Sequence, residues 1–409
     1  MQKHTQIYGF KKFQLIFILA LMSSLAPLST DMYLPALSHV EQSFKTNSFL
    51  TQLSLASFFI AVALGQLIYG PLSDIFGRKK PVLVGVLLFI VSSFLCVVID
   101  NIFGFITFRF FEALGGCAGV VVARAIVNDL FEIKEAAGIY ALMMVFSSLA
   151  PMLSPTFGGL LLQYFSWESI FMTLFLLGLL LFLMVLFGLK ESAPHLENKR
   201  FSRKETLNNY KIVLKDKMFL VYVFSAAFAL CAMFAYITGS SFIFTQTFGL
   251  SEQAFAALFG INALGFVIFA NVNAKLVQKF DAQKILAKAL VIMFIATLIL
   301  LVNAFLEPHF WLFESLLFIS ISMLGFIAPN TTTLAMARFK EQSGTASAVL
   351  GTSQFALAGL IAFGVGALNA NTPLILAIVM CACVLVANGV YFICRDSRIF
   401  STPRDNLID

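Results

Sequence analysis

The sequence from Phe49 to Ile99 reads FLTQLSLASFFIAVALGQLIYGPLSDIFGRKKPVLVGVLLFIVSSFLCVVI, and its pattern decides the fold. Two apolar runs, Phe49 to Tyr69 and Pro81 to Ile99, each have about 20 residues, the length with which a helix crosses the ~30 Å hydrocarbon core of a bilayer. The segment between them contains Gly, Pro and basic residues, which is typical of a short loop at a membrane surface. We therefore predict two membrane-spanning helices joined by a basic loop.

The composition extends this pattern to the whole chain. Hydrophobic residues make up 60% of the 409 residues and charged residues 12%, which is too little polar surface to cover a water-soluble core. The six cysteines fall within or at the ends of apolar runs, so we interpret them as packing residues and expect no disulfide. The four histidines lie at span ends or in loops, and neither a metal site nor a cofactor is expected.

Twelve apolar runs predict an all-α integral membrane protein in which two six-helix bundles are joined by a linker. The first bundle occupies residues 1–189, with spans at Phe13–Leu37, Phe49–Tyr69, Pro81–Ile99, Phe103–Val127, Ala136–Gln163 and Trp167–Leu189. A charged cytoplasmic linker loop follows in residues 190–217. The second bundle occupies residues 218–409, with spans at Met218–Thr245, Glu252–Ala274, Ile285–Leu306, Trp311–Ala337, Thr345–Leu368 and Pro373–Ile393.

The distribution of basic residues predicts how the chain lies in the membrane. Of the 27 Lys and Arg residues, Lys45 alone falls on the predicted outer side, and Arg109 and Arg124 fall inside a span. The others lie in or beside the loops and tails of the opposite side, and such a bias marks the cytoplasmic side. Both termini are therefore predicted to be cytoplasmic. The first apolar run is too long for a signal peptide and should remain as an anchor.

Three motifs carry a resemblance to a known family. GPLSDIFGRKK, Gly70 to Lys80, resembles the signature loop of the major facilitator superfamily, at the position between spans two and three where that family carries it. RFFEALGGCAG, from Arg109, is similar to the family's fourth-span motif, with Glu112 where Gln is usual. APMLSPTFGG, from Ala150, resembles the fifth-span motif typical of its antiporters, with Ala150 where Gly is commoner.

Further stretches resemble one branch of that superfamily. STDMYLPAL from Ser29, FAYITGSSF from Phe234 and GTASAVLG from Gly344 look like the bicyclomycin-resistance (Bcr/CflA-type) multidrug:proton antiporters. The resemblance covers nearly the whole chain. It implies the major facilitator fold, alternating access, location in the bacterial inner membrane and a part in antibiotic resistance.

Asp31, Arg109 and Glu112 are the candidates for proton coupling. Asp31 and Arg109 each lie about six residues from the outer surface, so they reach a similar depth and could meet. Burial favours a neutral carboxyl and a nearby Arg favours a charged one, which would tune Asp31 to load and release a proton. Asp31 could instead cap a kink at Pro27 or Pro35, or be a fixed partner for an Arg. Glu112 is either a local ion-pair partner of Arg109 or a second protonatable acid.

In the resembling family the loop between spans two and three acts as a conformational latch, here Gly70, Asp74, Gly77 and Arg78. Asp74 lies at the C-terminal end of a helix, where the helix dipole is unfavourable for an acid. We therefore expect it to meet a helix N-terminus of the second bundle near Gly344 or Thr345. A loop that only orients the chain is the alternative interpretation.

Two further groups of residues are expected to shape the transport pathway. Prolines and glycines of the fifth span should bend it and allow close helix contact, namely Pro151, Pro155, Gly158 and Gly159. Polar and aromatic residues on otherwise apolar spans are candidates for substrate binding, with interhelical hydrogen bonding as the alternative: Tyr33, Phe234, Tyr236, Asn262, Asn330 and Gln354.

These features favour proton-coupled efflux, that is antiport, of small, largely hydrophobic drugs or toxic compounds. Proton-coupled uptake or exchange of a metabolite is the alternative that the same fold allows. An enzyme is not expected, because the loops lack catalytic clusters and no ATP-binding G-x-x-x-x-G-K-[ST] motif is present. The expected partners are drug-like molecules, protons and the lipid bilayer, without nucleic acid, and the chain is expected to work as a monomer.

Overall fold

The computed structural model describes residues 10–131, 139, 153–192, 203–306, 308–339, 342–368 and 372–394. These residues form helices and connecting turns. The helices of the first half are α1 (Phe10–Asp31), the 3₁₀ turn η1 (Leu34–Ala36), α2 (Leu37–Ser43), α3 (Ser48–Phe76), α4 (Lys79–Val98), α5 (Ile102–Leu130) and α7 (Glu168–Gly188). Those of the second half are α8 (Arg203–Lys215), α9 (Lys217–Phe242), the π-helical turn η3 (Ile243–Thr247), α10 (Glu252–Leu276), α11 (Ala282–Leu306), α12 (Phe310–Met336), α13 (Ser343–Ala367) and α14 (Pro373–Ile393).

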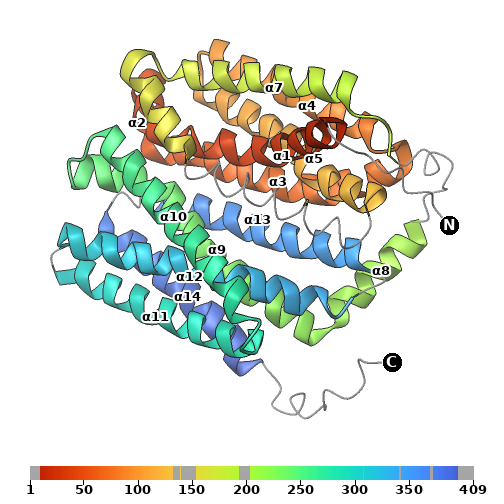
Figure 1. Ribbon diagram of the computed structural model, residues 1–409. Helices are drawn as coiled ribbons and strands as arrows, with labels where there is room; N and C mark the ends of the chain where they lie inside the picture. The colour runs from red at the N-terminus through yellow and green to blue at the C-terminus, as the bar shows by residue number, and fades with distance from the viewer. Residues whose placement is uncertain are drawn as a thin grey trace.

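Eleven helices within the described residues are long and apolar enough to cross a membrane. The predicted fifth span, Ala136–Gln163, lies partly outside the described residues, and its described part is helical over residues 153–164. We call the end of the molecule that holds α8 and the first residues of α1 the inner end, and the opposite end the outer end. In Figure 1 the outer end is on the left.

Side-chain caps fix where several helices begin. Asn47 accepts a hydrogen bond from the backbone of Leu50 at 3.0 Å, and Asn101 accepts one from Gly104 at 2.7 Å. Asp216 caps α9 in the same way through Phe219 at 2.8 Å. Each cap satisfies a backbone N–H that has no partner within its own helix.

The first span differs from its prediction because its helix is interrupted. α1 ends at Asp31, and the chain continues through η1 and the short helix α2. Pro35 lies in the first turn of η1, where it lacks an N–H and disfavours the α conformation of the residue before it. By contrast, Pro27 lies inside α1 without ending the helix. The break leaves Asp31 at the end of a helix, inside the protein.

Helices of the first half pack together in the upper part of Figure 1, and those of the second half in the lower part. α3 and α13 pack against each other between the two groups. A Cβ added to Gly359 would lie 2.5 Å from Cγ1 of Ile60, so the absence of a side chain allows this close approach. A Cβ added to Gly70 of α3 or Gly344 of α13 would meet no heavy atom within 4 Å. At these two glycines, near the inner end, α3 and α13 therefore do not pack as closely as they do at Gly359.

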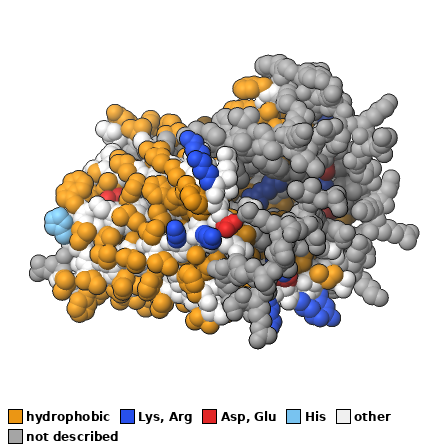
Figure 2. All heavy atoms as spheres, turned by 60° about the horizontal axis from the view of Figure 1, so that its bottom comes forward, with side chains coloured by type: hydrophobic (Ala, Val, Ile, Leu, Met, Phe, Trp, Pro, Cys, Tyr) orange, Lys and Arg blue, Asp and Glu red, His pale blue; other side chains and the backbone are white. Residues whose placement is uncertain are grey.

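Apolar side chains cover the helix faces that point sideways, away from the rest of the protein. Figure 2 shows hydrophobic side chains over the left part of the molecule, with Lys and Arg side chains further to the right, toward the inner end. On α11 and α14 the exposed apolar residues include Val291, Ile295, Leu298, Val302, Ile378 and Leu385. A soluble protein rarely exposes so continuous an apolar surface, whereas a lipid-facing helix requires one.

Candidate functional site

A buried ion pair lies inside the first half. Arg109 and Glu112 are three residues apart on α5, and Nη1 of Arg109 donates to Oε2 of Glu112 at 2.6 Å. Ser29 of α1 accepts from the same Nη1 at 2.7 Å and donates to Oε1 of Glu112 at 2.9 Å. Ser93 of α4 donates to Oε1 at 3.0 Å. Both charged side chains are fully buried, and together they form a neutral unit that joins three helices.

Aromatic rings surround the guanidinium of Arg109. Its central carbon lies 4.5 Å from the ring centre of Phe58, 4.9 Å from that of Tyr33 and 5.4 Å from that of Phe171. The Nε and Nη2 atoms of Arg109 are buried and have no hydrogen-bond partner among the described residues. The rings supply cation–π attraction instead. The Tyr33 hydroxyl lies 3.1 Å from that of Ser54, which fixes one of these rings.

Asp31 is buried close to this unit in the chain, two residues before Tyr33, but it does not take part in it. Its exposed fraction is 5%. Among the described residues no ion pair or hydrogen bond engages its carboxylate. The expected meeting of Asp31 with Arg109 is therefore not found, because Glu112, from the same helix as Arg109, already neutralises the guanidinium. Of the two interpretations of Glu112, the structure shows the ion-pair geometry.

A second buried acid, Glu314, lies in the second half. It is on α12, has an exposed fraction of 7%, and accepts a hydrogen bond from Nδ2 of Asn262 at 3.0 Å. The same Nδ2 donates to the hydroxyl of Tyr236 at 3.0 Å. Two predicted substrate residues, Tyr236 and Asn262, thus meet at one acid. Glu314 is not among the residues predicted from the sequence, although it is a charged residue inside a predicted span, the same signal that identifies Asp31.

The other candidate substrate residues lie in separate places. Phe234 of α9 packs against Phe59 of α3, with ring centres 4.7 Å apart, and against Phe355 of α13, with ring centres 5.7 Å apart. Asn330 donates to Asn273 at 2.8 Å, which is the interhelical hydrogen bonding given as the alternative. Gln354 is half-buried on α13, and Tyr33 belongs to the Arg109 site. The six predicted residues therefore do not form one cluster.

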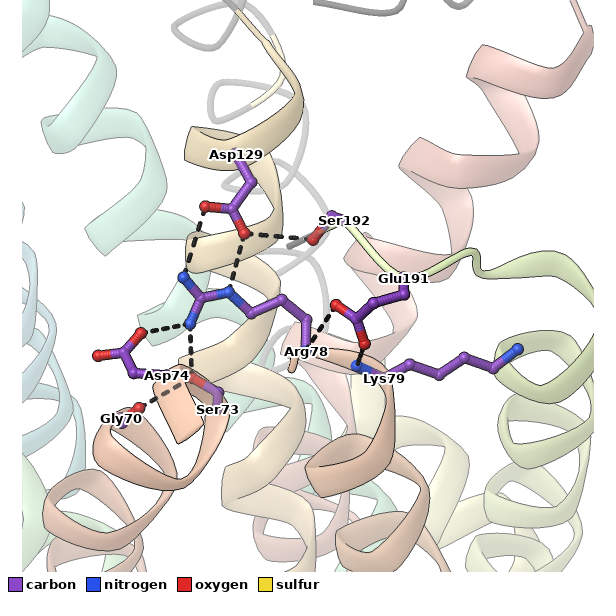
Figure 3. Close-up of polar contacts among 8 residues, drawn as sticks. All are labelled: Gly70, Ser73, Asp74, Arg78, Lys79, Asp129, Glu191 and Ser192. Atoms are coloured by element: carbon purple, nitrogen blue, oxygen red, sulfur yellow. Dashed lines mark hydrogen bonds and ion pairs between the residues drawn. The ribbon is translucent and has the colours of Figure 1, made fainter. Parts of the chain in front are cut away.

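The loop between α3 and α4 forms a polar network at the inner end (Figure 3). Arg78 donates through Nε to Asp129 of α5 at 2.8 Å, and through Nη1 to Asp74 at 2.6 Å and Ser73 at 2.9 Å. Burial opposes its charge, but the hydrogen bonds that Arg78 donates to Asp129 and Asp74 outweigh that effect and raise the pKa of the guanidinium. Arg78 thereby ties α3 to α5.

Glu191, just after α7, holds the other side of the same loop (Figure 3). Its two carboxylate oxygens accept from the backbone nitrogens of Arg78 at 2.8 Å and Lys79 at 3.0 Å. Gly77 has a φ of 80°, and a Cβ added there would lie 2.7 Å from the Glu191 carboxylate. Gly77 is therefore required both by its backbone conformation and by this contact.

In the part of the chain that the structure describes, no hydrogen bond or ion pair joins Asp74 to the second half, where a contact was expected. Its side chain is 63% exposed and bonds to Arg78 of its own loop. At Gly344, where the contact was expected, no heavy atom of the described residues lies within 4 Å of an added Cβ. Gly70 lies at the corresponding level of α3 and is equally open.

The fifth-span glycines allow close contacts on both sides. A Cβ added to Gly158 would lie 2.1 Å from the carbonyl oxygen of Met32, directly after Asp31. A Cβ added to Gly159 would lie 3.5 Å from Cβ of Ala256 on α10, so this helix touches the second half. Pro155 is in the helical residues 153–164, and Pro151 lies outside the described residues.

Comparison with known proteins agrees with this architecture. The sequence model of the Major Facilitator Superfamily matches residues 19–363. The chain is 32% identical over 393 residues to the uncharacterized MFS-type transporter YdgK of Bacillus subtilis, covering 96% of this chain and 98% of that one. It is 28% identical over 386 residues to a bicyclomycin resistance protein homolog of Haemophilus influenzae, covering 93% and 96%. It is 22% identical over 332 residues to the multidrug resistance protein MdtL of Vibrio parahaemolyticus, covering 81% and 83%.

Solved structures share the fold at low sequence identity. A D-xylose-proton symporter superposes with a TM-score of 0.76 at 14% identity, covering 93% of this chain and 97% of that one. A bacterial homolog of the human lysosomal transporter Spinster, in an inward-facing and unoccupied conformation, superposes with a TM-score of 0.72 at 16% identity, covering 95% and 98%.

The apolar helices with their buried polar sites, together with these relatives, define a class: a multi-pass bacterial membrane transporter, not an enzyme. The chain belongs to the Major Facilitator Superfamily, and its relatives place it in the Bcr/CflA-type branch. The family expected from the loop and span motifs is confirmed, as is the all-α fold of twelve helices.

Proposed function

We propose that this protein exports small, largely hydrophobic drugs or toxic compounds across the bacterial inner membrane in exchange for protons. The observation that carries the proposal is Asp31, a buried acid with no ion-pair partner among the described residues. Arg109 and Glu112 neutralise each other, so Asp31 is left as the excess negative charge of this region. An intramembrane acid in that situation favours binding a proton.

The position of Asp31 links proton binding to movement. α1 ends at Asp31, and the following turn packs against the fifth-span helix at Gly158. A charged Asp31 requires water, whereas a protonated one tolerates the packed environment. Proton binding would therefore favour the conformation in which this junction is closed. Each charge that crosses 100 mV supplies about 2.3 kcal/mol to drive the cycle.

Two observations support hydrophobic drugs as the substrates. Two relatives are named for resistance to bicyclomycin or to multiple drugs. In addition, Phe59, Phe234 and Phe355 bring aromatic rings from α3, α9 and α13 together between the two groups of helices. Apolar and aromatic walls are typical of sites that bind drug-sized molecules. In this proposal the chain acts as a monomer, and the inner end, with both termini, faces the cytoplasm.

The test is efflux of a fluorescent hydrophobic drug from cells, and drug-driven proton movement in oriented vesicles, with Asp31→Asn. We expect Asp31→Asn to abolish proton-linked efflux while the protein remains in the membrane. Asp100→Asn is the matched control, because Asp100 is exposed next to α4 at the outer end. Undiminished pumping by Asp31→Asn would refute the assignment. Inward drug movement together with protons would favour uptake, the alternative that this fold also allows.

A further inference from the structure

The carboxylate of Glu314 is incompletely satisfied. Oε1 accepts one hydrogen bond, from Asn262 at 3.0 Å, while Oε2 is buried without a partner among the described residues. No described Lys, Arg or His lies within ion-pair distance of it. A buried carboxylate that has neither a cation nor a full set of donors is strongly disfavoured in its charged form.

Asn262 has a matching defect. Both hydrogens of its Nδ2 are committed, one to Glu314 and one to the hydroxyl of Tyr236 at 3.0 Å. Its Oδ1 is buried and has no donor among the described residues. The two unsatisfied atoms, Oε2 of Glu314 and Oδ1 of Asn262, are both acceptors, on two planar groups that one hydrogen bond already joins. A single added proton would satisfy both, because a carboxylic acid and an amide can pair through two hydrogen bonds.

We propose that Glu314 is a proton-binding site of the second half, in which the protonated carboxyl donates through Oε2 to Oδ1 of Asn262. This site is additional to Asp31, which lies on α1 in the first half. The use of its proton in transport rests on the proposed function, whereas the binding of the proton does not.

The groups around Glu314 favour a proton, and not a larger cation, as the ligand of its carboxylate. The titratable group in contact through Asn262 is Tyr236 of α9, which is neutral near physiological pH. Among the other charged or titratable groups on the helices that pack here, Cys231 lies in the middle of α9 beside Cys383 of α14. The rest lie toward the helix ends: His309 precedes α12, Glu252 begins α10 and contacts His39, and the groups toward the inner ends are Lys217, Tyr222, Lys275, Asp281, Lys284, Lys288 and Arg338. An oxygen without accessible surface excludes larger cations in this conformation.

Glu314 lies in the second turn of α12, near the outer end, and α9, α10 and α12 pack around it. Opening of the outer end would bring water to this region, and closing it would bury the carboxyl again. A charged Glu314 therefore opposes closure, and a protonated one permits it. Proton loading from the outer side would thus precede the change to the present conformation.

The test is infrared spectroscopy of the purified full-length protein near neutral pH. We expect a carbonyl band of a protonated, hydrogen-bonded carboxyl that Glu314→Gln removes and that persists in Asp31→Asn. Asp281→Asn is the matched control, because Asp281 is a half-exposed acid just before α11 at the inner end and takes no part in the outer-end contacts. Asn262→Leu should move the band to the frequency of a carboxyl that donates no hydrogen bond. An unchanged spectrum in Glu314→Gln would overturn the proposal.

A second measurement guards against a merely structural effect of the substitution. Gln at position 314 supplies an N–H to Oδ1 of Asn262 without a proton to lose. In an Asp31→Asn background, the melting temperature should fall as pH becomes alkaline, and adding Glu314→Gln should make that fall clearly smaller. Equal pH dependence of the two proteins would count against the site. If the band is absent and Glu314→Gln instead loses binding of tetraphenylphosphonium, Glu314 is a site for organic cations and the proposal is wrong. None of these readouts requires transport, so they separate this proposal from the proposed function.

Discussion

Arg109 shows how one residue can hold several helices together in a protein whose solvent is lipid. Its charge is matched by Glu112, its Nη1 donates to Ser29 and Glu112, and three aromatic rings surround its guanidinium. Lipid-exposed apolar residues cannot supply such specificity, because lipid tails satisfy them equally well. Buried polar groups, in contrast, have few alternative partners. The relative placement of α1, α4 and α5 therefore depends on this small set of atoms.

The first prediction concerns this ion pair. Arg109→Met should lower the free energy of unfolding by about 3–5 kcal/mol, because it leaves Glu112 buried without its cation. The double variant Arg109→Met with Glu112→Leu should recover most of that loss, since neither charge then remains. Unfolding by denaturant titration in detergent measures both. Costs that simply add in the double variant would show that the two residues do not act as a pair.

The second prediction concerns pH at the inner end. Arg338, just after α12, donates to both oxygens of Asp216 at 2.8 and 2.7 Å. Burial acts in the opposite direction, but these bonds and the cap to Phe219 keep the pKa of Asp216 below its usual value of 3.8. The pair therefore stabilises the fold at pH values above that usual pKa and loses its effect as pH falls through the lower folded-state pKa. Asp216→Asn, which can still cap α9, should cost about 0.2–1 kcal/mol at neutral pH and make the stability less sensitive to acid. Asp281→Asn, in a more exposed pair with Lys284, should have a smaller effect.

At the scale of the elements, α13 is adapted to lie against α3. Gly359 lets its backbone approach Ile60 and Ala56, and Gly366 lies near Gln52 further toward the outer end. The contact is made by shape, so its strength depends on the absence of side chains on one face of α13. When the two groups of helices move relative to each other, α3 and α13 must either slide along this contact or separate at it.

The third prediction follows from that face. Gly359→Leu should force α3 and α13 apart, because its Cβ alone would meet Ile60 at 2.5 Å. We expect efflux to fall at least tenfold, with the protein still inserted. Gly364→Leu on the same helix is the matched control, since no heavy atom lies within 4 Å of a Cβ added there. Efflux rates normalised to membrane content measure the difference. Equal rates for the two variants would mean that this contact is not needed for transport.

Hydropathy and charge were sufficient to predict the spans, because lipid imposes helix length and apolarity on each segment separately. They were not sufficient to predict the break after Asp31, since Pro27 leaves α1 intact while Pro35 is associated with a 3₁₀ turn. The polar segment after α7, predicted as a loop, contains the helix α8, because charged residues are compatible with a helix that no hydropathy pattern marks. Boundaries were thus predictable, while local interruptions depended on context.

Partners of the buried charges were harder to predict than the charges themselves. Depth along a span suggested that Asp31 and Arg109 could meet, but depth carries no information about which way a side chain points. The spacing between Arg109 and Glu112 was the better signal, because residues three apart share a helix face. Glu314 could have been found by the criterion applied to Asp31. Its hydrogen bond to Asn262, however, joins two helices, so it cannot be predicted from the sequence of either segment alone.

At the scale of the whole molecule, the outer and inner ends differ in how they are held. His39 of α2 and Glu252 of α10 lie 2.5 Å apart at the outer end and join the two halves there. At the inner end, Arg78 and its acidic partners all belong to the first half, and Asp74 is largely exposed. Among the described residues, therefore, the ion pair at the outer end crosses between the two halves, whereas the Arg78 network at the inner end does not. Alternating access requires that this asymmetry be reversed, so the outer contacts must be weak enough to break in each cycle.

The last prediction tests that weakness. The side chains of His39 and Glu252 are 41% and 25% exposed, and pairs of this kind contribute about 0.2–1 kcal/mol. Glu252→Gln should therefore raise the ratio of outward-open to inward-open molecules by about 1.4- to 5-fold, without unfolding the protein. Spin labels on Ser166→Cys and Leu306→Cys, in a chain with the exposed Cys394 replaced by Ser, report the distance across the outer end. Distances that do not respond to the substitution would assign the closure of the outer end to the apolar contacts of α3 and α13 instead.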